Sequence, residues 1–488
     1  MDFFNFFTGP VGSLLGLLTS LLIIYRFVLK KIYIRKKDKK INKTDKFIET
    51  LKNKKYVNWK NDLINKIYSD DIRGESIYGI YYPVVSIEAD SSKKLINFKG
   101  KNNIPQLIFE ADKSVLTIRE DIGYYKIDGN VYKDYKDKIG TNLIKGRYCS
   151  KKHVNLLDLS KIKKEYVEIL GINSENGPID SETGKSLAKL HYPNTIGYAF
   201  LEMQVDNQDK MLGYTAQTCS YIENVTSSFI LEYEMYKLYE SSKYNDIDNK
   251  DETLKKLPIR ESIHQACEAH GGVVKSGKGR FSECSTQALV LYADSNNELC
   301  TVIFNRSNDV SYSPGTKQFI PCGYFEMFDS VDGESDDIDT TQSNFDSSIS
   351  TFKEFLEEIY GKEETQGIAN ASGIDYLKNH DILKSIWSDL NAENYLFLGS
   401  SFDLVTLTHS LSYLIYLPRD VHEYAHLKAN KDINEGKPKP QFIKNYLDSA
   451  TLKEKNLMPE SAGLLKLALK NSSFTKILQK HNIEYKAG

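Results

Sequence analysis

Cysteine is scarce in this chain of 488 residues, and no two cysteines have the Cys-x-x-Cys spacing of a zinc knuckle. Scattered cysteines exclude a disulfide framework and fit a reducing cytoplasm. Net charge is also small, at −2 with 40% hydrophobic residues, which is typical of a globular body. The sequence contains no internal repeat, and no DNA or RNA polymer is expected as a partner. The six cysteines are at positions 149, 219, 267, 284, 300 and 322.

The longest uncharged run stands at the N-terminus. No charged residue occurs from Phe3 to Tyr25, a stretch of 23 residues. About 20 apolar residues suffice for a helix to cross the hydrocarbon core of a bilayer. Proline is favoured at the start of a helix, so Pro10 sets the expected beginning. We predict an N-terminal transmembrane segment at residues 1–30, with its span at about 11–29.

A basic segment follows this apolar run. Residues 26–40 hold eight lysines and arginines against one acid, Asp38, a net charge of +7. Basic flanks stay in the cytoplasm, so we predict a single-pass protein with its N-terminus outside and the bulk of the chain in the cytoplasm. A secretory signal would carry its positive charge before the apolar run. The lipid bilayer is therefore an expected partner, and the lysines would attract its anionic headgroups.

A helix rich in glutamate is the second informative feature. Apolar residues recur at i, i+3, i+4 and i+7 from Phe352 to Ile359, which predicts one apolar stripe. Glu354, Glu357 and Glu358 fall on another face, where three carboxylates repel one another. A hard cation would neutralise them. We therefore predict that these glutamates bind Mg²⁺ or Mn²⁺.

A glycine turn precedes this helix in the sequence. Residues 321–326 read as a strand that ends in a tight turn at Gly323 and continues to Glu326. Paired strands are predicted just before it, at 285–293 and 298–306. A glycine turn that faces a Glu-x-x-Glu-Glu helix is an arrangement for holding metal-bound pyrophosphate.

The turn and the helix together resemble the signature of the Nudix superfamily, which runs Gly, five residues, Glu, seven residues, Arg-Glu, an aliphatic residue, any residue, Glu-Glu, any residue, Gly. Gly323 matches the first glycine, Asp329 stands where the first glutamate belongs, and Lys353 replaces the arginine. The spacing departs from the signature, because 23 residues separate Asp329 from Lys353. The extra stretch is acidic and rich in Ser and Thr, so we predict a solvated loop there.

The resemblance covers about residues 280–430, under a third of the chain. It implies an α/β/α domain with a mixed sheet, in which the three helix glutamates are the metal-binding and catalytic residues. Lysine offers a point charge where arginine offers a planar fork, so it would hold a carboxylate less rigidly. The ligand-binding residues that the match assigns are Gly323, Glu326, Asp329 and Lys353.

The remaining sequence predicts an α+β chain. Short runs of β-branched and aromatic residues, separated by Gly, Asn and Asp, indicate a β-rich middle segment. Two helices are expected in or after it, at about 221–242 and 252–269. The predicted divisions are the membrane segment at 1–30, a basic juxtamembrane and connecting helix at 31–75, a β-rich domain with helices at 76–255, a Nudix-like domain at 256–430, and a linker with a helical tail at 431–488.

A competing motif lies near the end of the Nudix-like region. His422, Glu423 and His426 satisfy the zincin pattern His-Glu-x-x-His. On an α-helix the two imidazoles would share one face, and Glu423 would activate a zinc-bound water. A third ligand is not evident. A zinc metalloprotease is therefore a minor alternative to two surface histidines on an ordinary helix.

The tethered architecture is similar to that of the transmembrane-Nudix effectors of the antiphage systems known as CBASS. That resemblance implies a cytoplasmic sensor of a nucleotide or cyclic oligonucleotide, which clusters as a homo-oligomer and disrupts the bacterial inner membrane. Those effectors are often described with two spans, whereas one is predicted here. The alternative is a Mg-dependent Nudix hydrolase of nucleoside-diphosphate-linked substrates, and a third is a scaffold. The sequence leaves open whether the chain is an enzyme.

Overall fold

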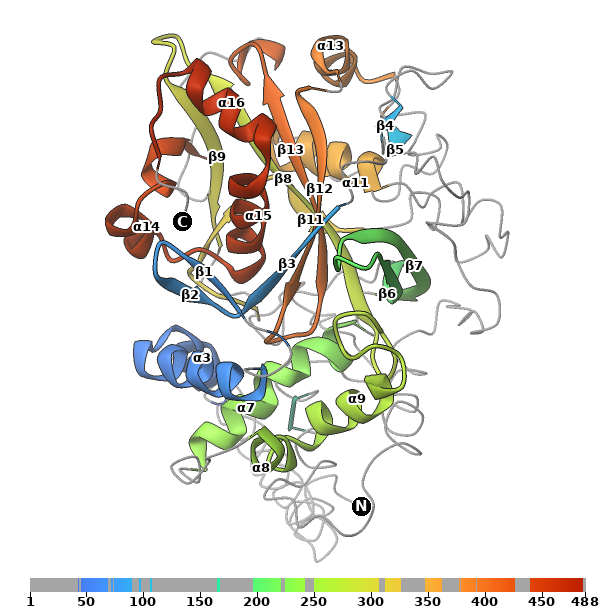
Figure 1. Cartoon of the computed structure of the whole chain (residues 1–488). Coiled ribbons are helices and arrows are strands. Elements are labelled where there is room, and N and C mark those ends of the chain that lie inside the picture. The colour runs from blue at the N-terminus through green and yellow to red at the C-terminus, as the bar shows by residue number, and fades with distance from the viewer. Residues whose placement is uncertain are drawn as a thin grey trace, which may run out of the picture.

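The structure is a computed structural model (Figure 1), and it describes part of the chain. No helix among these residues is long and apolar enough to cross a membrane. The predicted span at 11–29 and the basic segment at 26–40 lie outside them, so the membrane anchor stays a prediction. The described residues are 43, 45–68, 72, 74–89, 96–97, 106–107, 165–166, 196–220, 224–241, 250–306, 312–325, 347–361, 377, 379–391, 393–425 and 439–485.

A mixed sheet organises the larger part of the described chain. Its strands follow the order β10-β9-β8-β13-β12-β3, while β11 also pairs with β8 and β14 with β9. The pair β8–β13 is parallel and the other pairs are antiparallel. The strands are β3 (Val84–Glu88), β8 (Ser282–Ala293), β9 (Leu299–Asn305), β10 (Lys317–Phe319), β11 (Cys322–Tyr324), β12 (Tyr395–Asp403), β13 (His409–Leu417) and β14 (Lys439–Phe442).

Shorter strand pairs accompany this sheet. A hairpin of β6 (Ile196–Val205) and β7 (Met211–Ser220) joins the beginning of β8 through β6. Separate two-stranded pairs are formed by β1 (Glu75–Ile77) with β2 (Ile80–Tyr82), and by β4 (Ile96–Asn97) with β5 (Gln106–Leu107). The strands predicted at 285–293 and 298–306 are confirmed as β8 and β9, which pair with each other.

Helices cover both faces of the sheet, because its central strands are apolar on both sides. On β8, Leu289 and Leu291 belong to the core that contains helices α15 and α16, whereas Ala288 and Val290 belong to the core that contains α11. This alternation is the period-two pattern of a strand. The helices are α11 (Ser347–Glu354), α13 (Asp381–Asp389), α14 (Ser449–Lys455), α15 (Pro459–Lys470) and α16 (Ser472–Lys480), with a 3₁₀ turn at Ile443–Tyr446.

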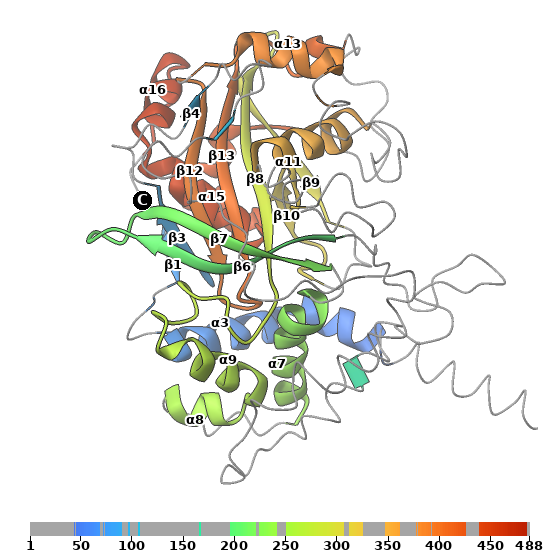
Figure 2. The ribbon, with the colours of Figure 1, turned by 90° about the vertical axis from the view of Figure 1, so that its right-hand side faces the viewer.

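A helical layer lies at one end of the sheet, below it in Figures 1 and 2. It contains α3 (Lys54–Tyr68), α7 (Ile230–Glu240), α8 (Lys250–Lys255) and α9 (Pro258–Glu268), and a π-helical turn at Val225–Phe229 leads into α7. The helix predicted at about 221–242 is confirmed by the π-helical turn and α7, whereas the one predicted at about 252–269 is two helices, α8 and α9, separated before Pro258. Arg260 of α9 joins this layer to the sheet, since its Nη1 donates to the carbonyl oxygen of Leu404 at 2.8 Å.

The α+β architecture with a mixed sheet is confirmed, and the sheet draws on three of the predicted divisions. Strand β3 comes from the predicted β-rich domain and pairs with β12. Helix α15 comes from the predicted tail and contacts β12 and β3. Strand β14, paired with β9, comes from the predicted linker and helical tail at 431–488. Segments distant in sequence thus share one core.

Candidate functional site

Gly323 and the glutamate helix lie in direct contact. The tight turn predicted at Gly323 was wrong, because this residue lies in the middle of strand β11 and pairs with Thr286 of β8. Helix α11 ends at Glu354. A Cβ atom at position 323 would lie 2.1 to 2.4 Å from the carboxyl atoms of Glu354, far inside van der Waals contact. Only glycine therefore lets this strand and this carboxyl group approach so closely.

Glu358 binds the same strand. Its Oε2 accepts a hydrogen bond of 2.7 Å from the backbone N–H of Cys322. Loss of water around the carboxyl group, together with the negative charge of Glu354, raises the pKa of Glu358 well above its ordinary value. The helix thus presents one carboxyl group that favours its protonated form, facing strand β11.

Lys353 supplies positive charge within the glutamate cluster. Its Nζ lies 3.5 Å from Oε1 of Glu354 and 3.4 Å from Oε2 of Glu357. All three side chains are largely shielded from solvent, with exposed fractions of 6%, 12% and 11%. Because the pairs are shielded, their attraction is stronger than that of surface ion pairs. The lysine that replaces the signature's arginine therefore still bridges two helix glutamates.

The end of the glutamate helix is a π-helical turn, which the sequence did not predict. Residues Phe355–Ile359 form this turn directly after α11. Phe352, Phe355 and Leu356 are buried, as the apolar stripe predicts. In a π turn the backbone hydrogen bonds join residues i and i+5, so the turn contains about one more residue than a turn of α-helix. Such turns occur frequently at functional sites. It carries Glu357 and Glu358, so it sets the directions of two of the three carboxylates.

The predicted metal is not supported by the described residues alone. Among them, no group of three or more His, Cys, Asp or Glu side chains is arranged to hold a metal ion. Lys353 bridges two of the glutamates, and Glu358 is bound to a backbone amide. Glu326 and Asp329 lie outside the described residues. The Mg²⁺ or Mn²⁺ ion therefore stays a prediction.

A second carboxyl cluster lies close to the first and was missed from the sequence. The hydroxyl group of Tyr312 lies 2.7 Å from Oδ2 of Asp403 and 2.7 Å from Oε1 of Glu460. Glu460, Glu358 and Arg306 all influence the pKa of the Cys322 thiol, which burial raises most strongly. Tyr312 and Glu460 are 148 positions apart in the sequence, so no local spacing signals the cluster.

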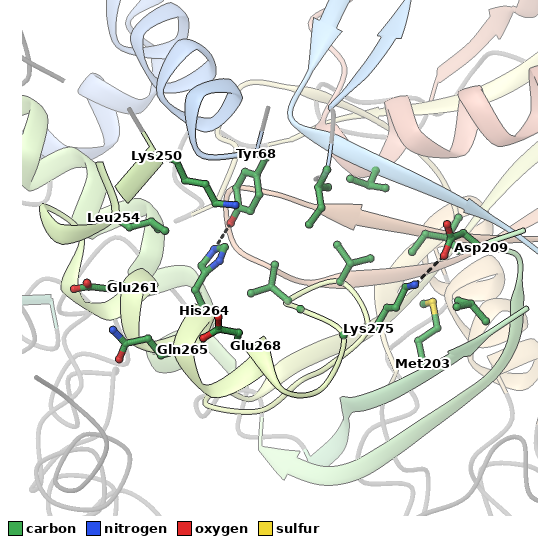
Figure 3. Close-up of a pocket in the computed structure, with 18 of the residues that line it drawn as sticks. Tyr68, Met203, Asp209, Lys250, Leu254, Glu261, His264, Gln265, Glu268 and Lys275 are labelled. Atoms are coloured by element: carbon green, nitrogen blue, oxygen red, sulfur yellow. Dashed lines mark hydrogen bonds and ion pairs between the residues drawn. The ribbon is translucent and has the colours of Figure 1, made fainter. Parts of the chain in front are cut away.

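The structure also contains a cavity of about 790 Å³ on another part of the protein (Figure 3). It lies between the helical layer, strand β3 and the β6–β7 hairpin. Tyr68, His264 and the glycine-containing segment Gly271–Lys275 contribute to its lining, and none of the predicted site residues does. Sequence reasoning missed this site, because Tyr68 and His264 are 196 positions apart.

The zincin alternative is not supported by the local structure. Residues Glu423–Ala425 form a short 3₁₀ helix, whereas the His-Glu-x-x-His pattern requires an α-helix to align its imidazoles. His422 is only partly exposed, and His426 lies outside the described residues. The prediction of an α-helix at this motif was therefore wrong.

No protein-family model and no curated protein matches this chain.

Proposed function

We propose that this chain is a membrane-tethered, Nudix-like effector that senses a nucleotide or cyclic oligonucleotide in the cytoplasm and disrupts the bacterial inner membrane in antiphage defence. The observation that carries the proposal is the contact between Gly323 and Glu354, with Glu358 bound to the amide of Cys322. A glycine against a Glu-x-x-Glu-Glu helix is part of the arrangement that the resemblance to Nudix proteins implies. The N-terminal apolar run supplies the tether.

Sensing is favoured over hydrolysis by the way the glutamates are engaged. Lys353 binds Glu354 and Glu357, so positive charge from the chain itself stands among the carboxylates. Glu358 is bound to the backbone amide of Cys322 at 2.7 Å. Chemistry on pyrophosphate depends on ionised carboxylates that hold a metal. A cluster engaged in this way suits ligand recognition better than turnover.

Ligand binding would act on the membrane through a change in assembly. A single apolar helix offers no polar path across a bilayer, so disruption requires several chains together. A ligand drives clustering only to the extent that it binds the clustered state more tightly than the separate chains. The expected partners are therefore the lipid bilayer, the nucleotide and further copies of this chain.

The test uses the full chain in liposomes that contain a self-quenched dye. Cyclic and linear nucleotides are added with and without Mg²⁺, and dye release is followed. We expect one nucleotide to trigger release, and Glu357→Gln to weaken it. Glu393→Gln, an exposed acid on the loop before β12, is the matched control. A chain that binds a nucleotide and never releases dye would defeat the proposal.

The same reactions decide between the alternatives. Release of a nucleoside monophosphate in the presence of Mg²⁺ would identify a Nudix-type pyrophosphohydrolase in place of a sensor. Absence of both nucleotide binding and metal binding would leave a scaffold. Each outcome is read from the same samples by chromatography of the nucleotides.

A further inference from the structure

The inner wall of the 790 Å³ cavity is formed by a pair of hydrogen-bonded rings (Figure 3). The Tyr68 hydroxyl lies 3.0 Å from Nε2 of His264 and also accepts a hydrogen bond of 3.0 Å from Nη1 of Arg260. A guanidinium can only donate, and a tyrosine hydroxyl has one proton to give. Within the described residues, Nε2 of His264 is the acceptor recorded for the buried Tyr68 hydroxyl, so we assign the hydroxyl hydrogen to the bond with Nε2.

This arrangement assigns the proton of His264. Burial and the positive charge of Arg260 lower the pKa of His264 to about 3, so the imidazole is neutral near pH 7. With Nε2 acting as an acceptor, the ring proton is on Nδ1. The ring lines the cavity, and Nδ1–H is the donor that it retains. Hydrogen bonds in a chain polarise one another, so Arg260 strengthens this donor through Tyr68.

Two buried arginines stand behind the same wall. Arg260 and Arg280 have exposed fractions of 0% and 3%, and neither forms an ion pair with a carboxylate within the described ranges. Arg280 donates to the carbonyl oxygen of Val273 at 2.8 Å, and Val273 lines the cavity. Arg280 also binds the carbonyl oxygen of Leu407 at 3.0 Å. The guanidinium groups donate to neutral acceptors, and burial raises the pKa of Glu234, the buried acid bound to the backbone of Arg260, to about 7. The two positive charges are therefore only partly balanced and favour a negative charge nearby.

The outer part of the cavity has a different character. Asp209 forms an ion pair of 2.8 Å with Lys275 at the side of the hairpin. Asp251 and Glu268 are exposed and Glu261 is half-buried, and Lys250 and Lys255 line the cavity with them, so water and these lysines screen the acids. Apolar side chains also line the cavity, among them Val205, Leu254 and Val274.

We propose that this cavity binds a small organic anion with an apolar body. The anionic oxygen accepts the hydrogen bond from Nδ1 of His264, in the field of Arg260 and Arg280, and the apolar body packs against Leu254 and Val274. The volume lies within the range of sites for small organic ligands. A nucleoside monophosphate and a medium-chain carboxylate both have this chemistry. The proposal is independent of nucleotide sensing at the glutamate helix.

The test measures binding to the full chain in detergent by calorimetry. The probes are adenosine monophosphate and octanoate, each beside its neutral counterpart, adenosine or octanol. We expect at least one anion to bind about tenfold more tightly than its neutral counterpart, as a charge-assisted hydrogen bond would require. The anion that binds shows whether the source is a nucleotide or a lipid-derived acid. Equal affinity of charged and neutral probes, or no binding of any probe, would overturn the proposal.

Variants locate the binding to this cavity. His264→Leu should weaken the anion about tenfold, because leucine has no hydrogen-bond donor. His270→Leu is the matched control, because His270 is exposed just beyond α9 and its Nε2 lies 2.6 Å from Nζ of Lys278. Val205→Phe narrows the cavity and keeps His264, so it should weaken charged and neutral probes alike. Unchanged affinity in His264→Leu, with the fold intact by circular dichroism, would contradict the assignment.

Discussion

Asp403 and Glu460 share the hydroxyl group of a single tyrosine in the protein interior. Oδ2 of Asp403 and Oε1 of Glu460 each lie 2.7 Å from the hydroxyl oxygen of Tyr312. One hydroxyl proton cannot serve two carboxylates, so one of the acids must carry a proton of its own. Burial and the charge of Asp403 raise the pKa of Glu460 to about 8. Glu460 is therefore the acid that holds the proton.

This pair predicts a pH-dependent stability. The folded state retains a proton on Glu460 that the unfolded chain releases above its ordinary pKa of 4.5, so stability falls as pH rises from about 4.5 to 8. Glu460→Gln stays neutral and should lose this dependence. Between about pH 4.5 and 8, the free energy of unfolding of the wild type should therefore fall by on the order of 4 kcal/mol more than that of the variant. Urea unfolding between pH 5 and 8.5 measures the difference.

The control for this pair is an acid outside the interior. Glu484→Gln, at an exposed position near the C-terminal end of the described chain, should leave the pH slope of the wild type unchanged. Equal slopes for the wild type and Glu460→Gln would mean that Glu460 is ionised in the folded protein.

Gly323→Ala should destabilise the protein through contact with Glu354. The added Cβ would lie 2.1 to 2.4 Å from the carboxyl atoms, so Glu354 must move away from Lys353. Overpacking of this kind costs about 1–3 kcal/mol. In Gly323→Ala/Glu354→Ala the clash is absent, and the loss in unfolding free energy should be smaller than the sum of the single losses. Strict additivity in a double-mutant cycle would rule out the contact.

Lys353→Met should destabilise the protein by removing positive charge beside two shielded carboxylates. The unbranched methionine retains much of the side-chain volume, so the loss is mainly electrostatic. Removing one partner of a buried ion pair costs about 3–5 kcal/mol at neutral pH. Urea unfolding at neutral pH tests this, with Lys384→Met at an exposed position of α13 as the control.

Removal of residues 1–42 should release the chain from membranes. The 23 uncharged residues from Phe3 to Tyr25 are long enough to span the hydrocarbon core, and no described helix is. We expect the full chain to resist extraction by alkaline carbonate and the shortened chain to appear in the soluble fraction. Release of the full chain by carbonate would contradict an integral anchor.

Local patterns in the sequence predicted several elements of the fold. The apolar stripe from Phe352 to Ile359 predicted a buried helix face, and the strands at 285–293 and 298–306 were predicted from their runs of β-branched and aromatic residues. Each of these signals is a short-range periodicity, which depends only on neighbouring residues. The contact between Gly323 and the helix was expected from a motif in which both parts are recognisable. The turn expected at Gly323 is a strand, because its backbone pairs with β8.

The two clusters of buried polar groups were decided by the tertiary structure alone. Tyr312, Asp403 and Glu460 meet because α15 packs on the sheet, and Tyr68 meets His264 across 196 positions. Burial changes the proton affinity of such groups, and the depth of burial of a side chain cannot be predicted from residue type or spacing. The sequence by itself determined the apolar run, the amphipathic helix and the strands, because these follow from periodicity along the chain. Which charges lose water and which partners they meet depends on how distant segments pack.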